Sequence, residues 1–152
     1  MRKMIFVFMC LLFALCLDSE TPSQTLEYQK GNENGAEVVV SQEVDQVIVV
    51  HFHKVQQCTC CRNVGMWAQE TINLYFSDEL ESEKIIYMDV CIEENMEMAR
   101  KYNAYGASLY INVIKNGNDT ISNAMQAWKH CLDHDVFVEV FRQMLEDALR
   151  GE

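Results

Sequence analysis

Residues 47–61 read VIVVHFHKVQQCTCC, and this stretch decides the predicted fold. The near-continuous apolar run over residues 47–53 predicts a buried strand that is covered on both faces of a sheet. After the cysteine cluster CTCC at residues 58–61, apolar residues recur at spacings of three and four over residues 62–80. That spacing predicts an amphipathic helix, so the cysteines lie between a buried strand and the start of a helix.

The segments that follow continue this alternation of strands and helices. We expect a buried strand at residues 85–90, a short helix at 94–103, a strand at 109–114, a hairpin turn at 115–118 followed by its partner strand, and a final helix that ends at Gly151. This order predicts an α/β fold with a mixed central sheet and helices on both faces. The cysteine cluster then lies at the carboxyl ends of the parallel strands, where reactive groups gather in such folds.

The first residues are predicted to be an export signal rather than part of the fold. Two basic residues precede an apolar run over residues 4–17, which is shorter than the about 17–25 residues of a bilayer-spanning helix. We therefore expect a signal peptide at residues 1–17, a flexible polar linker at 18–36 and one domain at 37–150. The product would be exported to the bacterial envelope, either periplasmic after plain cleavage or anchored by a lipid at Cys16.

The composition excludes several classes of function. The 152 residues carry 12 basic and 23 acidic side chains, a net charge of −11, whereas a nucleic-acid-binding surface is basic. No dinucleotide fingerprint, phosphate-binding loop or G-x-S-x-G elbow is present in the sequence. We therefore expect no nucleic acid as a partner, and membrane contact only through the possible lipid at Cys16.

Cys58 and Cys61 form a C-x-x-C pair at the predicted start of the helix. Two thiols with this spacing on a first helical turn come close enough to form a disulfide. The free backbone N–H groups of that turn stabilise a thiolate on the first cysteine, and Lys54 and Arg62 add positive potential. We expect Cys58 to be the nucleophile and Cys61 to resolve the mixed disulfide.

The C-x-x-C is part of a longer pattern, in which Phe52-His53, the residues KVQ and Gln57 precede Cys58. Residues 38–149 resemble the thioredoxin-like superfamily. They are most similar to a bacterial family that is associated with arsenic-resistance operons and is labelled a nitrophenyl-compound nitroreductase subunit. The similarity extends to Tyr75-Phe76, Asp78-Glu79-Leu80, Met88-Asp89-Val90, Lys115-Asn116-Gly117 and Trp128.

The resemblance implies a thioredoxin-like fold and thiol–disulfide chemistry, with a redox-active disulfide in place of a cofactor. The family pattern has an arginine where this chain has Gln57, so a positive charge is missing beside Cys58. Thioredoxins place a cis-proline before the strand that here starts near Leu109, whereas residues 37–150 contain no proline. Because no flavin or nicotinamide motif is present, the family label implies a thiol-handling partner rather than the nitroreductase itself.

Cys60 and Cys91 raise a second hypothesis. With Cys58 and Cys61, Cys60 gives three soft thiolates in one turn, a set that suits Cu(I) or arsenite. The alternative is that Cys60 is only a small residue inside the C-x-x-C. Cys91 follows the strand at residues 85–90 and lies at the same predicted sheet edge, so it either approaches the cluster or is a buried apolar cysteine.

His51 and His53 alternate along the strand before the cluster, so both lie on one face of the sheet. His53 belongs to the Phe-His pair of the family pattern. We therefore expect His53 to relay protons to Cys61 during resolution, with a local capping role as the alternative.

The sequence leaves three functions open. The first is an envelope thiol–disulfide oxidoreductase that acts on protein or small-molecule disulfides and thiols with an unidentified electron donor. The second is a soft-metal or arsenite carrier that uses Cys58, Cys60 and Cys61, and the third is a non-catalytic partner subunit of a reductase. Two of the seven cysteines lie in the predicted signal, so an odd number remains, which favours a redox or metal role over a disulfide framework.

Overall fold

β1 (Gln46–His53) is one of the two inner strands of a four-stranded sheet, as its near-continuous apolar sequence predicts. It pairs in parallel with β2 (Ile85–Cys91) and antiparallel with β3 (Ser108–Lys115), and β3 pairs antiparallel with β4 (Asn118–Asn123). The strand order is therefore β2-β1-β3-β4, with one parallel pair. This mixed α/β arrangement confirms the predicted fold class and is consistent with a thioredoxin-like fold.

The computed structural model describes residues 43–152. The predicted signal peptide (1–17), its Cys16 and the predicted linker (18–36) lie outside the described residues. None of the helices in the described part of the chain is long and apolar enough to cross a membrane.

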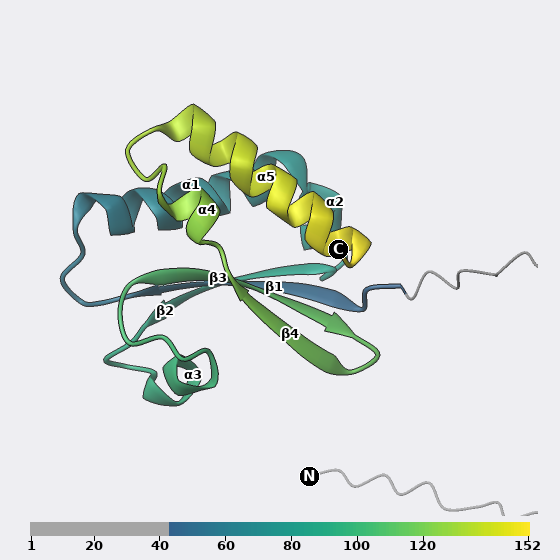
Figure 1. Cartoon of the computed structure of the whole chain (residues 1–152), viewed down its shortest axis with the longest axis horizontal. Coiled ribbons are helices and arrows are strands. Elements are labelled where there is room, and N and C mark those ends of the chain that lie inside the picture. Colours follow the sequence, from purple (N-terminus) through teal and green to yellow (C-terminus); the bar gives the residue numbers. More distant parts are fainter. Residues whose placement is uncertain (1–42) are drawn as a thin grey trace, which may run out of the picture. The chain divides into compact units, whose positions relative to one another are not determined.

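Helices cover both faces of the sheet, as predicted (Figure 1). One face carries α1 (Thr59–Tyr75), α2 (Ser77–Glu81), α4 (Met125–Trp128) and α5 (His134–Arg150). The other face carries α3 (Met96–Lys101). α1 is the connection between the parallel strands β1 and β2, so its first turn starts where β1 ends.

Two hydrophobic cores lie on the two faces because successive side chains of a strand point in opposite directions. Val49 of β1 belongs to the larger core, together with Phe137 and Phe141 of α5. Val50 and Phe52 belong to the smaller core on the side of α3. All five side chains are fully buried, and burial of one such side chain stabilises a fold by about 1.5–3 kcal/mol. The two cores therefore hold β1 in place and with it the segment that leads to the cysteines.

The hairpin between β3 and β4 turns at Asn116 and Gly117, where the sequence predicts it. Their φ angles of 52° and 72° lie in the left-handed region. Asn-Gly is the pair that two-residue hairpin turns favour, because both central residues need a positive φ.

The bounds predicted for the first helix, residues 62–80, are wrong, because this part of the chain forms two helices. α1 begins at Thr59 and ends at Tyr75, and α2 begins at Ser77. Phe76 between them is buried and has non-helical angles of φ −134° and ψ 34°. Its N–H bonds to the Ile72 carbonyl and its own carbonyl accepts from Leu80, so Phe76 closes one helix and opens the next. Apolar residues keep their spacing of four across this break, which hides the break from a periodicity argument.

The two shortest helices also differ from expectation. The helix expected at residues 94–103 spans only α3, because the Asn95 side chain caps it by accepting from the Met98 N–H, and Asn103 adopts a φ of 57°. α4 was not predicted, since a single turn is too short for a periodic pattern.

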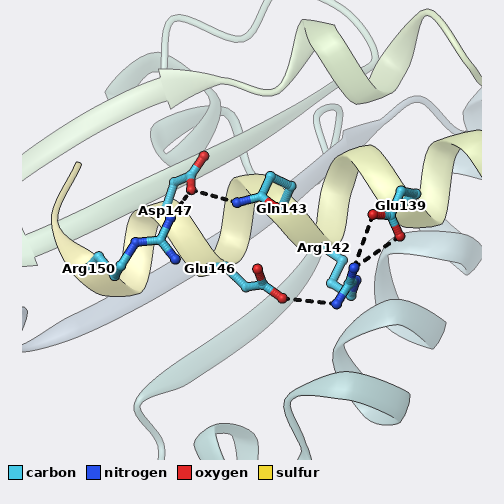
Figure 2. A network of polar contacts seen from close by, with 6 residues as sticks. All are labelled: Glu139, Arg142, Gln143, Glu146, Asp147 and Arg150. Carbon is cyan, nitrogen blue, oxygen red and sulfur yellow. Dashed lines mark hydrogen bonds and ion pairs between the residues drawn. The ribbon is translucent and has the colours of Figure 1, made fainter.

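Polar side chains form a network along the exposed side of α5 (Figure 2). Arg142 contacts Glu139 at 3.0 Å and Glu146 at 3.1 Å, and Asp147 contacts both Gln143 and Arg150. Pairs three and four residues apart stabilise a helix by about 0.2–0.5 kcal/mol each. All six residues of this network belong to α5, so the network supports the helix and is not a candidate site. They are Glu139, Arg142, Gln143, Glu146, Asp147 and Arg150.

Candidate functional site

Cys58 is the N-cap of α1, and its sulfur meets the first turn of that helix. The Cys61 N–H donates to Cys58 Sγ at 3.3 Å, and Cys58 Sγ lies 2.8 Å from Cys61 Sγ. The structure therefore brings together the two thiols that the C-x-x-C spacing pairs. Both lie beyond the carboxyl end of β1, which is the place that the strand–helix order predicts.

The two thiols have unequal acidities. The hydrogen bond from the Cys61 thiol lowers the pKa of Cys58, and the Cys61 backbone N–H lowers it further. Burial raises the pKa of Cys61, and its hydrogen bond to Cys58 adds to that effect. Cys58 is exposed and Cys61 is half-buried, so the thiol that ionises first is also the one that a substrate can reach.

Cys60 forms a disulfide with Cys131, a bond that sequence reasoning missed. The bond joins the first turn of α1 to the segment between α4 and α5, and the Asn63 side chain donates to the Cys131 carbonyl at 2.9 Å. The three-thiolate set of the alternative carrier hypothesis, at Cys58, Cys60 and Cys61, is therefore not formed, because the Cys60 sulfur is already bonded. Within residues 43–152 no group of three or more His, Cys, Asp or Glu side chains could hold a metal ion.

Cys91 ends β2 at the sheet edge where the parallel pairing predicts it. It lies opposite His53 in the register of β1 and β2. Its thiol donates to Glu93 Oε2 at 3.4 Å, and burial raises its pKa. Cys91 is thus a protonated thiol that is bonded to a neighbouring carboxylate and is not paired with the dithiol.

His51 is a buried histidine beneath α1, with only 1% of its surface exposed. Its Nδ1 lies 2.7 Å from Asp89 Oδ1, and its Nε2 has no hydrogen-bond partner among the described residues. Burial lowers the pKa of His51, although Asp89 and the Cys61 backbone act in the opposite direction. A histidine in this setting is neutral at neutral pH and has a free ring nitrogen close to the backbone of the resolving cysteine.

His53, the histidine that the sequence favours, bonds to its own backbone segment through one ring nitrogen. Its Nδ1 lies 3.0 Å from the Lys54 carbonyl, which can only accept, so Nδ1 is the donor. Its Nε2 lies 3.6 Å from Asp89 Oδ1, and its ring stacks on His51 with centroids 5.8 Å apart. The Nδ1 contact matches the local capping alternative, whereas the His51 ring packs against Gly65 of the dithiol helix.

Gly65 makes room for His51 inside α1. A Cβ at this position would lie 2.7 Å from both Cε1 and Nδ1 of the His51 ring. The Gly65 carbonyl also accepts a hydrogen bond from the Tyr87 hydroxyl of β2 at 3.0 Å. A glycine is therefore required here by the close approach of helix and strand.

We predict that Gly65→Ala destabilises the protein by about 1–3 kcal/mol, because the added methyl group displaces the His51 ring. Helix propensity alone would make the same change stabilising by about 1 kcal/mol, so the sign identifies the clash. Urea unfolding measures the effect, and Gly106→Ala is the matched control because a Cβ there meets nothing within 4 Å. Equal stabilities of the two variants would contradict the assigned contact.

A pocket of about 250 Å³ opens between α1 and β2, and its lining includes Gln57 and Arg62, the residues on either side of the C-x-x-C. We call it the α1–β2 pocket. Loop and helix side chains form one wall, and strand side chains that include the His51–Asp89 pair form the other. Its lining consists of His51, Gln57, Arg62, Gly65, Met66, Gln69, Tyr87 and Asp89.

Comparisons with known proteins add little to this geometry. No family model and no curated protein matches the chain. One similar solved structure is described as the structure of a malarial protein; it is 18% identical, and the match covers 66% of this chain and 98% of that chain with a TM-score of 0.40. A likeness at this level carries no argument about function, which therefore depends on the site itself.

Proposed function

We propose that this chain is a thioredoxin-like thiol–disulfide oxidoreductase of the bacterial envelope, with Cys58 as nucleophile and Cys61 as resolving cysteine. The observation that carries the proposal is the 2.8 Å approach of two free thiols whose pKa values are shifted in opposite directions. An exposed acidic thiol with a second thiol in bonding range is the arrangement that disulfide exchange needs. The disulfide between Cys60 and Cys131 supports an oxidising compartment, where such bonds persist.

The reaction has two exchange steps. The Cys58 thiolate attacks one sulfur of a substrate disulfide, forms a mixed disulfide and expels the other sulfur as a thiolate. Cys61 then loses its proton and attacks Cys58 Sγ, which releases the second substrate thiolate and leaves a Cys58–Cys61 disulfide. The substrate gains two electrons that the dithiol loses, and an external thiol donor regenerates the dithiol by the reverse steps.

The second step needs a base, because the raised pKa keeps the Cys61 thiol protonated. In this proposal His51 accepts that proton. Three observations support His51: its neutral form is favoured by burial, its Nε2 is unbonded, and Asp89 holds Nδ1. Asp89 would stabilise the imidazolium that forms, since its carboxylate accepts the bond from Nδ1.

We predict that His51→Gln slows resolution about a hundredfold at pH 7, so that the mixed disulfide on Cys58 accumulates. Because burial lowers the pKa of His51, the wild-type resolution rate should hold at neutral pH and fall only below the ordinary histidine value of about 6.5. In the variant, Cys61 must ionise without a base, so its slower resolution rate should rise with pH across this range instead of holding level. Stopped-flow mixing with acid quench and mass analysis separates the two steps, with His53→Gln as the matched control. A level rate near neutral pH that His53→Gln abolishes and His51→Gln retains would assign the relay to His53.

The proposed function is tested by equilibrating the full chain with dithiothreitol of varied oxidation state. Peptide mapping after alkylation then reports which cysteines have changed. We expect Cys58 and Cys61 to interconvert between dithiol and disulfide while the Cys60–Cys131 bond stays intact. A dithiol that remains reduced and unreactive toward every disulfide would contradict the proposal.

A further inference from the structure

The α1–β2 pocket presents polar groups that no protein contact satisfies. Among residues 43–152, no carboxylate lies within ion-pair distance of the Arg62 guanidinium, and the amides of Gln57 and Gln69 form no hydrogen bond. The pocket therefore offers one free cation and two free amides next to the dithiol.

The opposite wall carries a negative charge. Asp89 is about half exposed (53%), and both of its contacts with histidine involve Oδ1. Oδ2 is thus free to accept from a ligand. Met66 adds an apolar surface to the lining. A ligand that fits these walls carries a carboxylate and an ammonium group joined by a short apolar segment.

We propose that the α1–β2 pocket binds the α-amino-acid end of a low-molecular-weight disulfide, with its carboxylate on Arg62 and its ammonium on Asp89. This inference rests on the proposed function, and it names the substrate class of the same dithiol. The volume of about 250 Å³ lies below the about 300–1,000 Å³ of drug-sized sites, which favours a single amino-acid unit. The chain carries a net charge of −11, which repels a purely anionic disulfide but not a zwitterion.

The pocket borders the dithiol segment. Gln57 and Arg62 of its lining flank the C-x-x-C in the chain, and His51 of its lining lies at the Cys61 backbone. The Cys58 thiolate attacks the bound disulfide RS–SR, which forms Cys58–S–S–R and releases RS⁻. Cys61 then forms the bond to Cys58 and releases the second RS⁻, and each RS⁻ takes up one proton. The disulfide RS–SR is the oxidant, and the protein dithiol supplies both electrons.

The test measures the rate at which the reduced full chain is oxidised by four disulfides. Cystine carries both charged groups, cystamine only ammonium groups, dithiodiglycolate only carboxylates, and 2-hydroxyethyl disulfide neither. Each rate is divided by the rate of free dithiothreitol with the same disulfide, which removes differences in leaving-group reactivity. We expect the normalised rate with cystine to exceed that with the neutral disulfide at least about tenfold, or about 1.4 kcal/mol. The normalised rate with cystamine should fall between these two, and the rate with dithiodiglycolate, which the net charge repels, should not exceed that with the neutral disulfide.

Two variants separate binding in the pocket from general electrostatics. Arg62→Gln should lower the ratio of cystine to neutral rates about tenfold. Lys54→Gln is the matched control because it removes the same charge from the other side of Cys58, outside the pocket lining, and should keep the ratio. A wild-type ratio of one, or an equal drop in both variants, would overturn the pocket assignment and leave the oxidoreductase standing. If none of the four disulfides oxidised the wild type, the proposed function itself would fail.

Discussion

Cys58→Ser is expected to reduce disulfide exchange to the rate of the protein-free reaction. In the wild type, Cys58 is the exposed thiol, and hydrogen bonds from Cys61 lower its pKa. The remaining Cys61 thiol has a raised pKa and is partly buried, so it cannot replace Cys58 as the attacking group. The reduction of insulin by dithiothreitol, followed as turbidity, measures the loss.

Two further serine variants sharpen this prediction. Cys61→Ser should retain the first attack and trap a mixed disulfide on Cys58, which mass analysis detects. Cys91→Ser is the matched control because Cys91 is the other free cysteine of the described chain, and it should keep full activity. Activity that survives in Cys58→Ser but is lost in Cys61→Ser would reverse the assigned roles.

Removal of the Cys60–Cys131 disulfide is expected to cost about 4 kcal/mol of folding stability. The bond closes a loop with a sequence separation of 71, and the loss of chain entropy in the unfolded state grows with loop length. The Cys60→Ser/Cys131→Ser double variant avoids an unpaired thiol and removes the link between α1 and the segment that follows α4. Urea unfolding without reductant compares this variant with the wild type.

Cys91→Ser serves again as the control, since it changes a cysteine that makes no disulfide. Peptide mapping of the non-reduced protein gives an independent check. If the double variant and the wild type were equally stable, and Cys60 and Cys131 of the wild type were free thiols, the bond would be shown to be absent in solution. Cys60 would then be available as the third thiolate that the arsenite hypothesis needs.

The features that the sequence predicts correctly depend on local patterns. The C-x-x-C spacing and the change from an apolar run to a spacing of three and four place Cys58 at the start of a helix, and Asn116-Gly117 marks the hairpin. The mixed sheet follows from the order of such elements. Each of these signals lies within a few residues, so no tertiary contact is needed to interpret it.

The features that the sequence did not predict depend on contacts between distant segments. The partner of Cys60 is Cys131, and a pairing among several cysteines cannot be deduced from their order. Asp89 meets His51 only because the two residues face each other in the register of β1 and β2. Gly65 did leave a signal, a glycine inside a helical pattern, which indicates a close approach by another group.

The most direct test of the account is the pH dependence of alkylation at each thiol of the reduced protein. Iodoacetamide reacts with thiolates, and peptide mass analysis separates Cys58 from Cys61. Cys58 is expected to react with a midpoint below the ordinary thiol pKa of about 8.5, and Cys61 is expected to react more slowly throughout this range. Faster labelling of Cys61, or a Cys58 midpoint at or above the ordinary value, would contradict the account.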